Sequence, residues 1–271
     1  MSIIKNAYIG ADIECFVSLV KTGEIVSAEP YIKGTKNMPF NFDASNKFFA
    51  TSLDNVLAEI CIPPVKLGSK QCKADFVGNI NKSFDFVRSC LPKGFCTTHI
   101  PSAVLNEEYL NTDNAKLFGC EPDYNVWLRE VNEKPLASNP ALRSSGFHVH
   151  VGFDDPNTEA VEACVKTMDL FLSVPSILIE PENERRKLYG KAGAFRFKDY
   201  GFEHRVLSGY FASSEQLKNW VFSNTEAAIN FVNAGRFEEV EAVGEQIQEA
   251  INSANKELAG NLIRQFEIEL V

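Results

Sequence analysis

Three short polar triplets interrupt apolar stretches of this 271-residue chain and carry the side chains best suited to chemistry. They are Asp12-Ile13-Glu14, His148-Val149-His150 and Glu203-His204-Arg205. On a β-strand the side chains at i and i+2 share a face, so each triplet, as a strand, presents two polar groups side by side. Carboxylates, imidazoles and a guanidinium gathered on one sheet face predict a cation-assisted reaction on an anionic, phosphorylated substrate.

The first two triplets and Glu59 can each be explained without a functional site. Asp12 and Glu14 could be an acidic pair that faces water, but apolar residues flank them on both sides. Glu59 stands on the apolar stretch 57–62 and needs a cation or a partner if it is buried. His148 and His150 could be a hydrogen-bonded or solvent-facing pair. Two of only four histidines on one face favour ligands or proton carriers instead.

The third triplet ends a basic segment in an acidic protein. Residues 185–205 hold seven basic and two acidic side chains, whereas the whole chain has a net charge of −9. A solvated charged face, or a simple Glu203–Arg205 ion pair, would also explain this pattern. The functional interpretation is that Glu203 holds a cation while Arg205 binds phosphate through its bidentate fork. Hard oxygen ligands with a few imidazoles suit Mg²⁺ or Mn²⁺ better than zinc.

Composition excludes several other classes of protein. No apolar run approaches the roughly 18 to 20 residues of a membrane helix, and the negative charge disfavours nonspecific binding to nucleic acid or to an anionic membrane. The N-terminal residues lack the long apolar stretch of a signal peptide, which predicts a cytoplasmic location. There is no GxGxxG or GxxxxGK[ST] motif, so a Rossmann or P-loop nucleotide site is not expected.

The seven cysteines are odd in number and contain no CxxC pair, so neither a disulfide framework nor a zinc knuckle is indicated. They are most simply explained as small buried residues. A catalytic thiol at Cys120, in the turn 119–122, is the alternative, and a Cys120→Ser variant with full activity would eliminate it.

The elements that must position these residues follow from periodicity and turn residues. We expect a hairpin over 7–33, two short strands within 47–63, and strands at 95–100, 146–153 and 193–211. Helices are expected over 69–91 with Ser69 as N-cap, 158–172 with Asn157 as cap, 215–232 and 238–266, the last two interrupted at Gly235 and Gly244. The segment 106–142 is predicted to be irregular. This order predicts an α+β fold with a mainly antiparallel sheet, as one domain of residues 1–271.

The ordered series of motifs resembles a known family. The resemblance spans roughly residues 7–212, and a helical part over about 213–271 lies outside it. The matching segments are Gly10–Glu14, Leu53–Glu59, Phe118–Asp123, Gly146–Gly152, Arg185-Arg186 and Glu203–Arg205. They look like the phage-type carboxylate-amine (COOH-NH2) ligases, which are similar in turn to glutamate-cysteine ligases and glutamine synthetases.

The resemblance implies a glutamine-synthetase-like curved antiparallel sheet whose concave face holds ATP and Mg²⁺ or Mn²⁺. The implied reaction is formation of an amide or peptide-type bond between a small-molecule or peptide carboxylate and an amine, through an acyl phosphate. If the chain is phage-encoded, the location is the host cytoplasm. The implied metal ligands are Glu14, Glu59, His148 and Glu203, with Asp12 beside them. The implied cofactor-binding residues are Arg185, Arg186, Lys191, Arg196, Arg205 and His150, and the implied catalytic residues are Lys191, Arg196 and Arg205.

Three other functions remain compatible with the sequence: a phosphotransferase on the same fold, a metal-dependent hydrolase, and a non-catalytic phage accessory binding protein. The hydrolase leaves the arginine-rich segment unexplained. The identities of the acid and the amine cannot be read from the sequence. The amphipathic C-terminal helices suit either packing or self-association, so the oligomeric state stays open.

Overall fold

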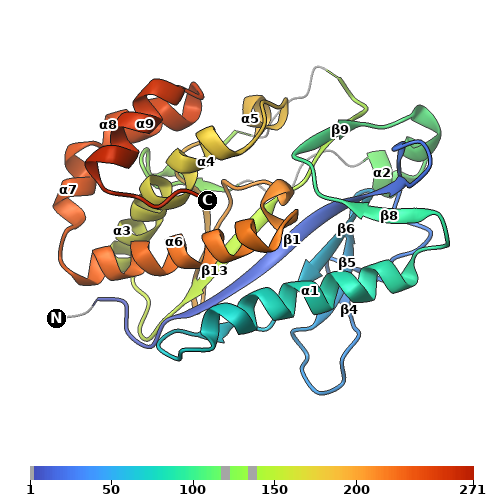
Figure 1. The fold of residues 1–271 in the computed structure, drawn as a ribbon, viewed down its shortest axis with the longest axis horizontal. Coiled ribbons are helices and arrows are strands. Elements are labelled where there is room, and N and C mark those ends of the chain that lie inside the picture. Colours follow the sequence, from blue (N-terminus) through green and yellow to red (C-terminus); the bar gives the residue numbers. More distant parts are fainter. Residues whose placement is uncertain (1–2, 117–122, 134–138) are drawn as a thin grey trace.

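The computed structural model describes residues 3–116, 123–133 and 139–271. Its centre is a long strand, β1 (Tyr8–Leu19), which crosses the molecule diagonally in Figure 1. The other strands of the main sheet are β2 (Ile25–Val26), β3 (Gly34–Thr35), β4 (Met38–Asn41), β5 (Ala50–Asp54), β6 (Leu57–Cys61), β7 (Val65–Lys66), β8 (Phe95–Thr98), β10 (Tyr124–Asn125), β11 (Glu130–Val131), β13 (Phe147–Gly152), β14 (Ala194–Lys198) and β15 (Gly201–His204). A separate pair is formed by β9 (Ser102–Val104) and β12 (Leu142–Ser144).

Within the described residues the main path through the sheet runs β11-β10-β14-β15-β13-β1-β6-β5-β3-β4, while β2, β7 and β8 pair with β1. All recorded pairings are antiparallel except the single-residue pairing of β3 with β5. The first half of β1 lies between β13 and β6, which places Asp12 opposite His148 and Glu14 opposite Glu59. Residues directly opposite in an antiparallel pair share a face, so β1 collects polar groups from both neighbours.

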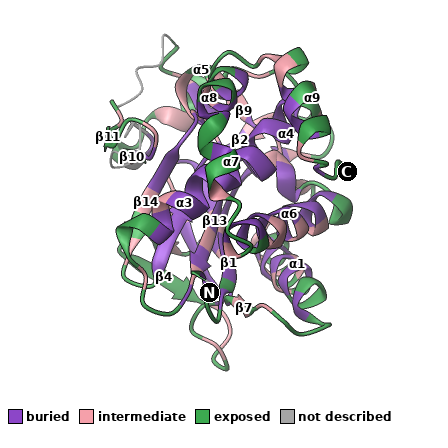
Figure 2. Ribbon diagram, turned by 90° about the vertical axis from the view of Figure 1, so that its left-hand side faces the viewer, coloured by how far each residue is buried: buried purple, intermediate pink, exposed green. Residues whose placement is uncertain are grey.

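Helices cover the other face of this sheet, where the core lies. The helical segments are α1 (Cys72–Cys90), η1 (Glu107–Leu110), α2 (Asp113–Lys116), α3 (Thr158–Met168), the π-helix η2 (Asp169–Ser173), α4 (Val174–Ile179), α5 (Arg185–Leu188), η3 (Gly209–Ala212), α6 (Glu215–Asn233), α7 (Phe237–Ala242), α8 (Gly244–Asn252) and α9 (Lys256–Gln265). Helices α1, α3 and α6 pack against one another and onto strands such as β6 and β15. Figure 2 shows buried residues concentrated on the central strands and on the inward faces of these helices.

Alternation along the central strands explains this layering. Ile13 of β1, Ile60 of β6 and Val149 of β13 are fully buried in the apolar core beneath the helices. Their sequence neighbours Glu14 and His148 point to the opposite face. The expected α+β class with a mainly antiparallel sheet is therefore confirmed.

Several local predictions were wrong in their details. The second strand of the predicted 7–33 hairpin is only β2, because β1 pairs with β8, β13 and β6 along the rest of its length. Helix α1 begins after Gln71 without a side-chain cap, so Ser69 is not its N-cap. Asn157 does cap α3 by accepting a hydrogen bond from the backbone N–H of Ala160 at 3.0 Å.

Two predicted helices are also divided. The pattern over 158–172 continues past α3 into the π-helix η2, which lets Asp169 and Ser173 face one buried position. The stretch 238–266 forms α7, α8 and α9 rather than one helix, with breaks at Val243 and near Ala254, whose φ is +50°. The expected interruption at Gly244 is confirmed.

Candidate metal and phosphate site

The polar face of the sheet brings three of the predicted metal ligands together. One ligand atom each from Glu14, Glu59 and His148 lies within 4.8 Å of the others. The three residues come from β1, β6 and β13, three neighbouring strands whose register fixes the approach. Glu14 and His148 are each 6% exposed, so this group is largely shielded from water.

The two glutamates carry more negative charge than their surroundings compensate. Burial, together with the neighbouring carboxylates of Asp54 and Glu59, raises the pKa of Glu14 well above its ordinary value. Burial and the charge of Asp12 raise the pKa of Glu59 to about 7. Among the described residues each glutamate accepts one hydrogen bond: the backbone N–H of Gly146 donates to Glu14 at 2.7 Å, and the Ser52 hydroxyl donates to Glu59 at 2.7 Å.

His148 is held as a neutral imidazole. Burial and the nearby Arg205 guanidinium lower its pKa well below the ordinary histidine value. Neutral imidazole keeps a nitrogen lone pair, which is the form that binds a metal ion. Gly146 is required beside it, because a Cβ at that position would collide with Nε2 of His148.

Asp12 and His150 form a second acidic and imidazole pair on the same face. Oδ2 of Asp12 lies 3.1 Å from Nε2 of His150, and the Tyr200 hydroxyl lies 2.5 Å from Nδ1 of the same ring. Burial opposes charge on both partners, but their mutual attraction lowers the pKa of Asp12 and raises the pKa of His150. The predicted neighbours of the metal ligands are therefore themselves an ion pair.

Glu203 lies between the basic residues and the group formed by Glu14, Glu59 and His148. Its carboxylate contacts the guanidinium of Arg205, and it lies 2.8 Å from Nζ of Lys198 and 3.9 Å from Nη1 of Arg196. Burial opposes the charge of Glu203, but Arg205 and the other cations hold its pKa below the ordinary range. Nδ1 of His148 is 3.5 Å from Glu203, so the basic group adjoins the metal-ligand group directly.

The remaining predicted phosphate-binding residues lie farther along the segment and differ in role. Arg185 is 3% exposed and donates to the backbone carbonyls of Val206 and Leu207 at 2.8 and 3.0 Å. Arg186 is paired with Glu180 at 2.7 Å. Lys191 is half-buried near Arg186, and burial with that neighbouring charge lowers its pKa.

A different polar group lies on the helix-covered side of β15. Asp169 of η2, 0% exposed, accepts hydrogen bonds from Trp127 Nε1 at 2.7 Å, the Gly193 backbone N–H at 2.6 Å and the Ser173 hydroxyl at 3.0 Å. Its Oδ1 also lies 3.1 Å from Nε2 of His204. His204 thus points away from Glu203 and Arg205, and Asp169 ties β15 to the loop that precedes β14. We call Asp169, Trp127, Ser173, His204 and the Gly193 N–H the Asp169 network.

The chemistry of the donors on the polar face fits a hard divalent cation. Two carboxylates and one neutral imidazole converge, and burial together with neighbouring carboxylates raises the pKa values of both glutamates. Oxygen ligands with an imidazole are a set that Mg²⁺ or Mn²⁺ accepts. Glu14, Glu59 and His148 are the residues that would hold such a cation.

Sequence reasoning missed three residues of this face. Asp54 on β5 adds a carboxylate whose charge raises the pKa of Glu14, and Ser52-Leu53-Asp54 has the same polar-apolar-polar pattern as the predicted triplets. Lys198 follows Arg196 by two residues on β14, a spacing that puts both on the face of Glu203. Lys36 pairs with Asp54 and had no pattern that could have identified it. Cys120, the proposed alternative nucleophile, lies outside the described residues, as does most of the motif 118–123.

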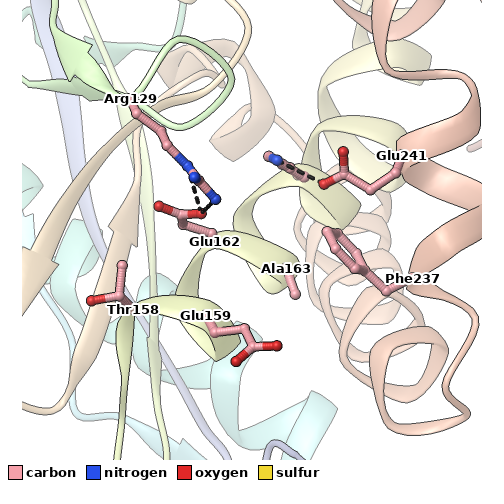
Figure 3. A pocket seen from close by; sticks show the side chains of 8 residues that line it. Arg129, Thr158, Glu159, Glu162, Ala163, Phe237 and Glu241 are labelled. Atoms are coloured by element: carbon pink, nitrogen blue, oxygen red, sulfur yellow. Dashed lines mark hydrogen bonds and ion pairs between the residues drawn. The ribbon is translucent and has the colours of Figure 1, made fainter.

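A groove elsewhere on the molecule shares none of these residues. It has a volume of about 540 Å³ and is lined by Arg129, Thr158, Glu159, Glu162, Ala163, Lys166, Phe237 and Glu241. Figure 3 shows that Arg129 turns toward Glu162, and Lys166 lies 2.7 Å from Glu241. These two ion pairs neutralise four of the five charges that line the groove and leave the exposed carboxylate of Glu159, so the groove does not gather several carboxylates as the sheet face does.

Residues 139–271 match the family described as "Phage phiEco32-like COOH.NH2 ligase-type 2". This match to a family of carboxylate-amine ligases covers the C-terminal part of the chain and agrees with the resemblance of its motifs. His148, Glu203 and Arg205 lie within the matched residues, whereas Glu14 and Glu59 precede them.

Three solved structures are similar to the chain at low identity. A bifunctional glutathione synthetase from Pasteurella multocida is 11% identical with a TM-score of 0.40, covering 97% of this chain and 49% of that one. "Apo GmaS without ligand" is 13% identical with a TM-score of 0.40, covering 98% and 70%. A "novel glutamine synthase homolog" is 11% identical with a TM-score of 0.39, covering 96% and 66%.

The chain therefore spans about half the length of the glutathione synthetase and about two thirds of the glutamine synthase homolog. No curated protein matches the chain. Among the residues that the structure describes, no helix combines the length and the apolar character needed to cross a bilayer.

Proposed function

We propose that this protein is an ATP- and divalent-cation-dependent ligase that joins a carboxylate to an amine. The observation that carries the proposal is the convergence of Glu14, Glu59 and His148 within 4.8 Å, directly beside the basic residues around Glu203. A cation site next to a phosphate-type site is what transfer of a phosphoryl group requires. The match of residues 139–271 to a carboxylate-amine ligase family supports the same reaction class.

In this proposal the polar face has two parts with different tasks. Glu14, Glu59 and His148 hold a divalent cation, which when bound neutralises phosphate charge and orients ATP. The Asp12–His150 pair keeps a further negative charge beside it, since His150 holds the pKa of Asp12 down. Glu203 lies between this part and the basic residues and aligns them with the cation.

The basic part of the face neutralises the phosphate oxygens of ATP. Arg205, Arg196 and Lys198 surround Glu203. Arg196 and Lys198 lie on β14, whose register with β15 is fixed, and Arg205 directly follows β15. A planar guanidinium matches two phosphate oxygens at once, which positions as well as stabilises. Lys191 and Arg186 extend this positive charge, whereas Arg185 holds the backbone of residues 205–207 in place.

The reaction proceeds in two balanced steps. A carboxylate oxygen of the acid takes the γ-phosphoryl group of ATP, giving an acyl phosphate and ADP. The amine nitrogen then attacks the acyl carbon and loses a proton, the carbon–oxygen bond to phosphate breaks, and an amide and inorganic phosphate are released. The chain's residues contribute positioning and charge neutralisation to the first step, in which negative charge moves between oxygens.

The test is release of ADP by purified protein given ATP, Mg²⁺ and mixtures of amino acids or peptides as acids, with hydroxylamine as the amine. We expect ADP and a hydroxamate to form together, since hydroxylamine traps an acyl phosphate. Glu14→Gln should abolish both products. Glu159→Gln, which changes an exposed carboxylate in the groove of Figure 3, should leave both unchanged.

Three outcomes would replace this proposal. A stable phosphorylated product without a hydroxamate would identify a phosphotransferase. Metal-dependent cleavage of amides without nucleotide would identify a hydrolase. Failure of the metal-saturated protein to bind ATP in a calorimetric titration would contradict both nucleotide-dependent functions and leave a binding protein.

A further inference from the structure

Lys36 is a cationic side chain that reaches the carboxylates of the polar face from outside the sheet's main strands. It stands in the turn between β3 and β4, and its Nζ lies 2.7 Å from Oδ2 of Asp54. Asp54 lies two residues after Ser52 on β5 and shares its face, and the Ser52 hydroxyl donates to Glu59 at 2.7 Å. The carboxylate that pairs with Lys36 is thus a neighbour of the cation-binding group on the same face of the sheet.

The charge of Lys36 acts on the proposed metal ligands themselves. It lowers the pKa of both Glu14 and Glu59, against the larger opposing effect of burial. The hydrogen bonds to these two carboxylates come from neutral groups, the Gly146 N–H and the Ser52 hydroxyl. In the protein without a divalent cation, Lys36 therefore supplies positive charge beside these carboxylates, through its ion pair with Asp54.

The backbone around Lys36 is fixed while its side chain is exposed. The Met38 N–H donates to the Thr35 hydroxyl at 3.2 Å across the turn, and the Thr51 hydroxyl donates to the Lys33 carbonyl at 3.1 Å. The Lys36 side chain is 47% exposed, whereas that of Asp54 is 21% exposed. A long flexible lysine on a fixed turn can leave its partner for water without any movement of the strands.

We propose that Lys36 is a built-in counter-ion of the carboxylate cluster that competes with the divalent cation and is released when the cation binds. This inference rests on the cation-binding role of Glu14, Glu59 and His148 proposed above. Lys36 then controls how tightly the site binds its metal. Its charge stabilises the metal-free carboxylates, and this stabilising free energy is lost when the metal binds, which weakens metal binding by the same amount. Asp54, which holds the lysine, is then a determinant of metal affinity.

If Lys36 competes with the cation, removing its charge should strengthen metal binding. Isothermal titration of the nucleotide-free protein with Mn²⁺ should show Lys36→Met binding roughly two- to fivefold more tightly than wild type, the range expected for a partly exposed ion pair. Lys33→Met is the matched control, because it removes the same charge from the same hairpin, where Lys33 lies over the Phe40 ring. The control should bind Mn²⁺ within about twofold of wild type.

Coupling to Asp54 separates competition from a general effect of charge. In an Asp54→Asn background, adding Lys36→Met should change Mn²⁺ affinity by less than about twofold, because the anchor of the lysine is already gone. Equal tightening in both backgrounds, or equal tightening by Lys33→Met, would show that only net charge matters and would overturn the proposal.

The wild-type protein provides a test that does not depend on any variant folding. Brief acetylation followed by peptide mass spectrometry should show Mn²⁺ increasing the labelling of Lys36 relative to Lys33. Unchanged or reduced labelling of Lys36 in a protein that does bind Mn²⁺ would overturn the counter-ion role and leave the proposed ligase intact. Absence of Mn²⁺ binding in both wild type and Lys36→Met would remove the metal site itself, and this inference with it.

Discussion

The two faces of the sheet each hold a buried acidic group, and the groups are satisfied in opposite ways. On the helix-covered side, the carboxylate of Asp169 meets four donor groups within 3.1 Å, from a tryptophan, a serine, a histidine and a backbone amide. On the polar side, Glu14 and Glu59 have one neutral donor each and lie against further carboxylates.

This difference separates a carboxylate that stabilises the fold from carboxylates that are expected to bind a ligand. Burying a charge is unfavourable unless partners compensate, and Asp169 has its partners within the fold. Glu14 and Glu59 lack such compensation, so their pKa values rise and the protein is expected to lose stability for keeping them. Residues that destabilise the folded chain in this way are expected where a ligand completes the set.

The largest expected effect is on the structural side. Asp169→Ala leaves several buried donors without an acceptor and should lower the free energy of unfolding by about 3 to 5 kcal/mol. Urea denaturation measures this loss. Asp169→Asn, which keeps one acceptor oxygen, should lose roughly half as much. Equal stability of the alanine variant and wild type would show that the Asp169 network is not a structural tie.

Neutralising an acid on the polar face should have the opposite effect on stability. Glu14→Gln removes a carboxylate that burial and Asp54 disfavour, so the unfolding temperature of the metal-free protein should stay the same or rise. Its affinity for Mn²⁺ should fall at least about 100-fold, because a ligand is lost. Calorimetric titration measures the affinity and thermal unfolding measures the stability. If Glu14→Gln lowered both, Glu14 would stabilise the fold as Asp169 does, and the proposed difference between the two faces would be wrong.

The pH dependence of stability should reveal Glu59. Its pKa is about 7 in the folded protein and has an ordinary value near 4.5 otherwise. Between these values the folded state binds more protons than the unfolded state, so this carboxyl makes the metal-free protein less stable as pH rises, with no further loss above about pH 7. Denaturation from about pH 4.5 to 8 tests this against Glu59→Gln, which should lack this contribution. An identical slope in the variant would assign the effect to other groups.

The smallest effects compare one serine on each face. Ser173→Ala removes a single donor to Asp169 and should cost about 1 kcal/mol of stability without changing Mn²⁺ affinity. Ser52→Ala removes the donor to Glu59 and should weaken Mn²⁺ binding about two- to fivefold with little loss of stability. A reversal of these two outcomes would exchange the roles of the faces.

Much of the polar face was predictable because strand alternation is a strong local rule. Asp12, Glu14, His148 and His150 lie where the i and i+2 spacing places them, and the antiparallel register brings them opposite one another. The same rule applied to Ser52-Leu53-Asp54 also places Asp54 on this face, because β5 extends to Asp54. The turn to β6 begins at Asn55, whose φ is +60°.

Other parts of the site depend on tertiary contacts that no local pattern contains. The partner of His204 is Asp169, and their contact joins a strand to a π-helical turn distant in sequence. A run of basic residues does not indicate which guanidinium turns inward, as Arg185 does toward backbone carbonyls. Lys36 lies between two very short strands with no periodicity, so only the folded structure reveals its contact with Asp54.

The central position of β1 has a consequence for how the protein is made. During synthesis β1 emerges first, and its pairing with β6 needs only a nearby part of the chain, whereas Ile13 must wait for Phe147 and Tyr8 for Gly152. Until then an apolar strand edge is exposed, which favours association between incomplete chains. The same pairing that completes the cation ligands also closes this edge, so the chain becomes protected against aggregation only when His148 reaches Glu14.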